Sequence, residues 1–210
     1  MMKSRIVEIP AVVIVLLVCA SPSTAALIEF NDGQIHNIDY QINGDVLVDL
    51  GTIVNLVTGG NISGHLRVKD GGRLNVSGGI VRSSLSAWGN SLVTVTGGNI
   101  DGYLQACGAS TVLYSGGQVQ KDFEMWGYGR LIVSGSNFAI DGNPVVFGEY
   151  SCPGANCNGL LTGQLASGEL FANEFWIHDR LSKLVLAPEP ATLLLLGFGG
   201  MALLRRRRQA

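Results

Sequence analysis

The chain has little of what most enzymes and metal sites depend on. Only 14% of its 210 residues are charged, and only three are histidine (His36, His65 and His178). These histidines form no convincing Ser-His-Asp order, and the glycines match neither a phosphate-binding loop nor the calcium-binding Gly-Gly-x-Gly-x-Asp nonapeptide. We therefore expect no catalytic residue, no cofactor and no metal site.

Positive charge is scarce once the two ends are set aside. Between Ala26 and Pro190, eight basic residues remain after Lys3, Arg5 and the four terminal arginines are removed, against fifteen acidic residues after Glu8 is removed. The resulting net charge near −7 disfavours nucleic acid and anionic membrane surfaces as partners.

The chain also lacks an apolar run long enough to span a membrane easily. At the start, Lys3 and Arg5 precede an apolar run over residues 11–20, and small residues follow. This order is typical of a secretory signal, which we place at residues 1–25 with cleavage after Ala25. Lipidation of Cys19 is the alternative, and Val18 disfavours it.

The other end carries a second addressing segment. Pro188, Glu189 and Pro190 precede an apolar stretch ending at Leu204 and then a basic cluster, Arg205, Arg206, Arg207 and Arg208. A helix of about 14 residues reaches about 21 Å, short of the ~30 Å hydrocarbon core. We expect this helix to hold the chain in the membrane only transiently, with the arginines on the cytoplasmic side.

Residues 188–210 resemble the PEP-CTERM sorting signal, whose triplet, short Leu-rich helix and arginine cluster occur in this order. The resemblance implies recognition by an exosortase, with cleavage near the triplet. The same tail is also catalogued as an ice-binding protein C-terminal domain. An ordinary C-terminal membrane anchor is the alternative.

Between the two ends, a glycine doublet recurs every 19 residues. It begins at Gly59, Gly78, Gly97 and Gly116 and weakens at Gly135. The glycines are expected to make a corner in each repeat. When the repeats are aligned on the doublet, equivalent apolar residues form one column before this corner and a second column after it. The first column contains Val57, Val76, Val95, Tyr114 and Val133, and the second contains Leu66, Leu85, Leu104 and Phe123. In the neighbouring column of Leu74, Val93, Val112 and Leu131, Asn55 is the exception.

A fixed period of this size is typical of a solenoid. We predict an all-β fold, a parallel, right-handed β-helix of five to six coils over residues 26–145. The column after the doublet, Ile62, Val81, Ile100 and Val119, is expected to open the second strand of each coil. A meandering antiparallel sheet is the alternative.

Residues 146–187 are expected to close the stack with further β-strands. Cys152 and Cys157 lie in a Gly/Pro/Asn loop, where an exported protein favours a disulfide over a metal site. Cys107 is then left over, as a buried, inert thiol. The segment 159–166 resembles one found in exported PEP-CTERM proteins with Gly-Gly repeats, which implies architecture and placement but no activity.

Outward positions of the second strand suggest a binding surface. Column periodicity predicts that Ser84, Ser86, Cys107, Trp88 and Trp126 face outward. The hypothesis is a glycan platform made by Trp88, Tyr103, Gln105, Glu124 and Trp126, because indoles stack on sugars. The alternative is that both tryptophans merely cover a corner of the stack.

Two weaker hypotheses are a polysaccharide-active enzyme and an ice-binding surface. Asp122 and Glu124, about 7 Å apart by strand rise, suit a polysaccharide-active enzyme, although paired acids on a strand usually form a solvated face. Thr94 and Thr96 are too few for an ice-binding ladder.

The sequence therefore predicts an exported, non-enzymatic structural or adhesive protein of the cell surface or extracellular matrix. Its expected partners are an exosortase, the inner membrane before processing, and extracellular polysaccharide. A carbohydrate-binding module is the alternative.

Overall fold

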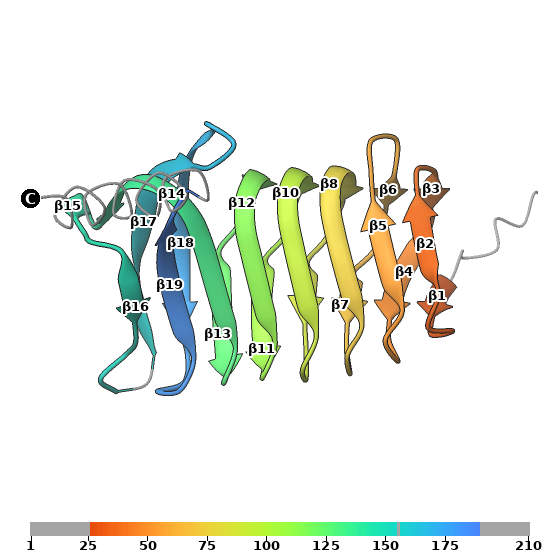
Figure 1. Ribbon diagram of the computed structural model, residues 1–210, viewed down its shortest axis with the longest axis horizontal. Helices are drawn as coiled ribbons and strands as arrows, with labels where there is room; N and C mark the ends of the chain where they lie inside the picture. Colours follow the sequence, from red (N-terminus) through yellow and green to blue (C-terminus); the bar gives the residue numbers. More distant parts are fainter. Residues whose placement is uncertain (1–25, 155, 190–210) are drawn as a thin grey trace, which may run out of the picture.

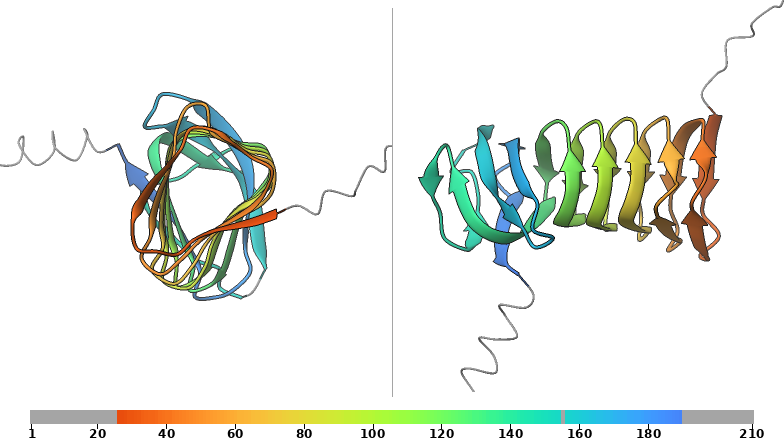
Figure 2. Two further views of the ribbon diagram at one scale, coloured as in Figure 1. Left: turned by 90° about the vertical axis from the view of Figure 1, so that its right-hand side faces the viewer. Right: turned by 90° about the horizontal axis from the view of Figure 1, so that it is seen from above.

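The chain folds into an elongated stack of β-strand turns (Figure 1). The structure, a computed structural model, describes residues 26–154 and 156–189. These residues form the strands β1 to β19, wound around one long axis (Figure 2). The predicted all-β parallel solenoid is confirmed, with about six turns. The predicted signal peptide and apolar tail helix lie outside the described residues.

Parallel strands line up in columns along the axis. The first column contains β1 (Ala26–Phe30), β4 (Gly44–Val48), β7 (Leu66–Val68), β9 (Leu85–Ala87), β11 (Leu104–Gly108) and β13 (Phe123–Gly127). The second contains β2 (Ile35–Ile38), β5 (Ile53–Leu56) and the first parts of β8 (Arg73–Val81), β10 (Leu92–Ile100), β12 (Thr111–Val119) and β14 (Arg130–Ile140). A short third column contains β3 (Gln41–Ile42), β6 (Asn61–Ile62) and the ends of β8, β10 and β12. We call β1–β14 the stack.

The interior of the stack is made by like side chains lying over like. Val76, Val95, Tyr114 and Val133 are paired from turn to turn, and none is more than 1% exposed. Alternation along each strand sends every second residue inward, and the parallel register places equivalents above one another. The predicted in-register column is therefore confirmed for these four residues.

The predicted register is wrong by one residue in the turn before. The structure pairs Leu56, not Val57, with Val76, and Asn55 with Asn75. The reason is a longer turn between β5 and β6, because Leu56 to Ile62 spans one residue more than Val76 to Val81. Asn55 is thus no exception, since it accepts a hydrogen bond from Asn75 and donates one to Asn37, both at 2.8 Å.

The glycine doublets do not end strands as predicted. In β8, β10 and β12 the strand continues through the doublet, where the pairing register shifts. Gly98 has φ +88°, and a Cβ there would lie 2.7 Å from the Gly78 carbonyl oxygen, so only glycine fits this bend. The column of Val81 and Ile100 therefore closes one strand instead of opening the next.

Beyond β14, the chain leaves the stack and then returns to it. The β14 strand turns back into β15 (Asn143–Pro144), and β16 (Gly148–Tyr150) and β17 (Cys157–Leu165) follow. β18 (Leu170–Ile177) then lies over β13, and β19 (Lys183–Pro188) over β14, as a last partial turn. We call β15–β19 the closure, because β16 and β17 pair antiparallel along its outer edges.

The opposite end of the stack has no comparable cover in the described part of the chain. There β1, β2 and β3 each pair with one neighbour, β4, β5 and β6. Leu27, Ile35 and Tyr40 are at least half exposed at this end. The two ends of the molecule are therefore built differently.

Candidate functional site

The predicted glycan platform corresponds to a groove on the first column. A hollow of about 380 Å³ is lined by Trp88, Gln105, Cys107, Glu124 and Trp126. The register pairs Cys107 with Trp126 and places Trp88 one turn away on the other side. Trp88 and Trp126 are 45% and 43% exposed, so they form open walls instead of buried packing. We call this hollow the Trp groove.

The floor of the Trp groove is a thiol that faces outward but is covered. Cys107 is free and only 2% exposed. Burial, with a smaller contribution from the Glu124 charge, raises the pKa of its thiol to about 12. The thiol therefore stays protonated at neutral pH and offers no nucleophile.

One side of the Trp groove is a ladder of polar side chains. Ser86 donates a hydrogen bond to Gln105, and the Gln105 amide donates one of 2.6 Å to Glu124. Ser84 and Ser86, which were predicted to face outward, are both buried, and each is hydrogen-bonded to the neighbouring turn. The ladder fixes the orientation of the Gln105 and Glu124 side chains.

Two residues that were predicted for this surface, Tyr103 and Asp122, lie outside the Trp groove. Tyr103 does not line the Trp groove; Lys121 instead lies over its ring, 4.9 Å from the centroid. Asp122 does not line it either, so the groove brings in only one carboxylate of the predicted pair. The predicted pair of carboxylates therefore does not meet in the Trp groove.

One residue beside the Trp groove, His178, was not predicted from the sequence. The ring of His178 stacks on Trp126, with centroids 3.5 Å apart and planes 11° from parallel. Met125 pairs with Ile177 of the last turn. His178, the residue after Ile177, is therefore the equivalent of Trp126 in that turn and lies beside it. The segment inserted before β18 breaks the 19-residue period, so column alignment gave no sign of this contact.

The remaining titratable and sulfur groups are dispersed. Cys152 and Cys157 form a disulfide, with Cα atoms 5.7 Å apart. Across residues 26–154 and 156–189, no group of three His, Cys, Asp or Glu residues is placed to hold a metal ion. The same residues contain no helix long and apolar enough to cross a membrane.

The predicted sorting triplet begins inside the fold. Pro188 is the last residue of β19 and pairs with Gly135 of β14. On the other edge, Leu186 pairs with Gly148 of β16. Pro188 and Glu189 are both half-buried, whereas Pro190 and the cluster Arg205, Arg206, Arg207 and Arg208 lie outside the described residues.

Residues 186–208 match the PEP-CTERM protein-sorting motif. No curated protein and no solved structure matches the chain. The PEP-CTERM motif marks the chain as an exported protein that is targeted by an exosortase. Its first residues, from Leu186 to Pro188, are also the last residues of β19, so the sorting signal and the folded sheet overlap.

Proposed function

We propose that the protein is a non-enzymatic structural or adhesive scaffold of the cell surface or extracellular matrix. In this proposal the PEP-CTERM tail holds the chain briefly in the inner membrane until an exosortase removes it. The observation that supports the proposal is the overlap of the motif with β19, because it joins the sorting signal directly to the folded stack. The stack is then the part of the chain that is exported. The solenoid contributes long, regular outer faces, while its interior is filled by side chains.

Expression of the full chain in a bacterium with an exosortase, and in the same strain lacking it, tests this placement. We expect the wild-type strain to release a form without Arg205–Arg208, detected by mass spectrometry, and the deletion strain to retain the full chain in its membranes. A chain truncated after Ala187 serves as the control. An extracellular form that keeps the arginine cluster would contradict the proposal.

The Trp groove favours carbohydrate binding as a second function. Trp88 and Trp126 lie two turns apart, which corresponds to about 9.5 Å along the stack. A ring in contact with two aromatic faces needs about 8 Å between them. His178 covers one face of Trp126, which leaves the other face toward Cys107 and Trp88. A sugar ring suits this space, with Gln105 and Glu124 as hydrogen-bonding groups for its hydroxyls.

A glycan array probed with the protein tests this second function. We expect binding that Trp126→Ala reduces at least tenfold, because one stacking wall is lost. Tyr103→Ala is the matched control, since Tyr103 lies on the preceding turn but outside the groove. Binding that survives in Trp126→Ala, or no binding by the wild type, would refute the glycan role.

A further inference from the structure

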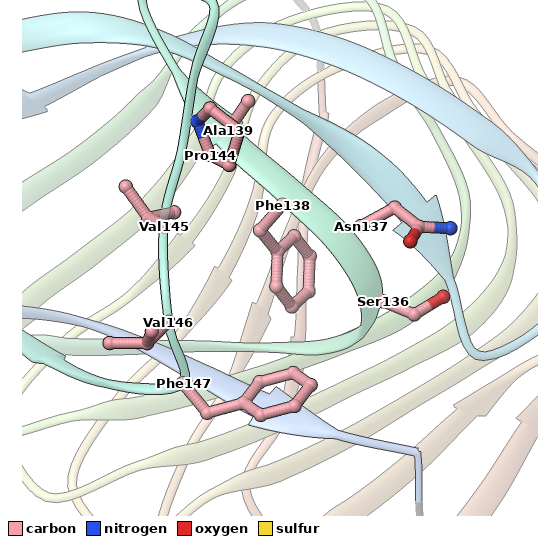
Figure 3. A pocket seen from close by; sticks show the side chains of 8 residues that line it. All are labelled: Ser136, Asn137, Phe138, Ala139, Pro144, Val145, Val146 and Phe147. Carbon is pink, nitrogen blue, oxygen red and sulfur yellow. The ribbon is translucent and has the colours of Figure 1, made fainter.

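A second hollow lies at the end of the molecule from which the tail leaves. It measures about 560 Å³ and is lined by Ser136–Ala139 on one side and Pro144–Phe147 on the other. The two segments flank the antiparallel pairing of β14 with β15 and are shown in Figure 3. We call residues 136–139 the first arm, residues 144–147 the second arm, and the two together the fork. The arms converge where the Val145 amide donates a hydrogen bond of 3.0 Å to the Phe138 carbonyl.

The β19 strand lies between β14 and β16 and ends where the two arms begin. Its Pro188 pairs with Gly135, the residue before the first arm, and its Leu186 pairs with Gly148, the residue after the second arm. Continuing the antiparallel register places Phe147 opposite Ala187. The PEP-CTERM tail therefore leaves the sheet beside this fork.

The second arm exposes large apolar side chains. Val146 is 80% exposed and Phe147 50%, although Phe147 also contacts Phe138 with ring centroids 6.1 Å apart. Residues 142–148 carry no charge, and Tyr150 holds the arm by donating a hydrogen bond to the Val146 carbonyl. An uncharged, exposed apolar edge of this kind is typical of a contact surface.

The distance from β19 to the apolar tail identifies what this edge meets. Only Glu189 and Pro190 separate Pro188 from Ala191, where the apolar run begins. Three extended residues span at most about 10 Å. A tail inserted in a bilayer would hold Pro188, and Phe147 beside it, within that reach of the membrane interface.

We propose that Val146 and Phe147 form a membrane-docking edge, which rests on the lipid bilayer while the tail is inserted. The inference rests on the tail anchoring proposed above. The contact is apolar in kind, since the net negative charge of the folded part disfavours electrostatic attraction to anionic lipid. Docking therefore depends little on lipid charge or on salt.

Spin labelling of residues 26–210, the chain without its predicted signal segment and hence without Cys19, in phosphatidylcholine vesicles tests the docking edge. A nitroxide is attached at Val146→Cys or, as the control, at Leu50→Cys, which lies in an exposed turn between β4 and β5. The native Cys107 is buried, so it does not compete for the label. Flotation first establishes that the protein is anchored, and power saturation then compares collisions of each label with oxygen and with a water-soluble nickel chelate.

We expect the Val146 label to lose at least fivefold in nickel accessibility relative to the Leu50 label while it keeps its oxygen accessibility. Equal nickel accessibility at both sites in floated protein would overturn the docking edge but leave the anchoring intact. A Val146 label shielded from both reagents would mean that the chain's own tail fills the hollow, which also overturns the proposal. Failure to float would refute the anchoring and the docking edge together.

Discussion

The stack and the closure consist of the same kind of strand but are specified in different ways. In the stack, strands pair in parallel with their equivalents in neighbouring turns, so one repeated pattern sets many contacts. In the closure, β16 pairs antiparallel with β19, and β17 pairs antiparallel with β14 and β18. Each of these contacts occurs only once. Repetition is enough to build the middle of a solenoid, whereas the closed end of this one is built from contacts of its own.

The junction between the two regions shows what those unique contacts do. Asn173 is buried and donates hydrogen bonds of 2.7 and 2.8 Å to the carbonyls of Val119 and Lys121. Glu169 accepts a hydrogen bond from the Gly117 amide, and Asp179 accepts one from the Gly127 amide. These side chains satisfy backbone groups that a further identical turn would otherwise have paired.

Truncating one phenylalanine in each region should give the largest contrast. Phe123 is fully buried in the stack and packs against Tyr114 and Phe171, whereas Phe147 is half exposed in the closure. We expect Phe123→Ala to lower the free energy of unfolding by about 3–5 kcal/mol, and Phe147→Ala by about 1 kcal/mol. Urea denaturation measures both, and equal losses would contradict the comparison.

The next largest effect is expected at the junction. Asn173→Ala removes two hydrogen bonds and leaves two carbonyls without these donors, at a cost of about 2–3 kcal/mol. Hydrogen exchange should then show the closure opening before the stack. The exposed Asn158, on β17, provides the control as Asn158→Ala. Simultaneous loss of protection in both regions would mean that the two unfold as one unit.

Removing the disulfide should affect the closure alone. Cys152 and Cys157 are five residues apart, and closing so short a loop contributes about 2 kcal/mol. We expect Cys152→Ser/Cys157→Ser to increase hydrogen exchange in β16 and β17 and to leave β8 and β10 unchanged. Cys107→Ser controls for the loss of a sulfur atom inside the stack. Faster exchange in β8 in the double variant would argue against independent closure.

The smallest effect is expected from an exposed ion pair that ties β16 to β19. Lys183, with a smaller contribution from Arg130, lowers the pKa of Glu149, and their nitrogens lie 2.9 and 2.6 Å from its carboxylate. Such a pair stabilises the fold above the carboxyl's unfolded pKa, and this stabilisation is lost as pH falls through the folded value.

We therefore expect Glu149→Gln to lower Tm by about 1 °C at pH 7. The difference from wild type should shrink as pH falls below the ordinary glutamate pKa of about 4.3. It should disappear only below the lowered folded pKa, where the carboxyl is protonated in both states. Thermal unfolding at several pH values measures this. A difference that stays constant with pH would mean that the side chain acts through packing instead of charge.

Sequence periodicity predicted the parts of the molecule that repeat. Val76, Val95 and Val133 were placed correctly because a constant period makes one turn a template for the next. The Leu56 register failed because a single extra residue in a turn shifts the strand before it. The bend at Gly98 could not be told from a corner, since both need a backbone that only glycine adopts readily.

The Trp groove was partly predictable for the same reason. Column positions brought Trp88, Gln105, Glu124 and Trp126 to one surface, but side-chain size decided that Cys107 would form the floor. His178 and the fork at Phe147 depend on how the closure folds back, and nothing periodic in the sequence records that path.

The equal step between turns has a consequence for how such a chain can change over time. A middle turn touches only its two neighbours, so duplication or deletion of one 19-residue unit would leave both ends intact. Each added unit would move β1 about 4.8 Å farther from the tail exit. The number of units therefore sets the distance between β1 and a surface to which the tail end of the molecule is attached.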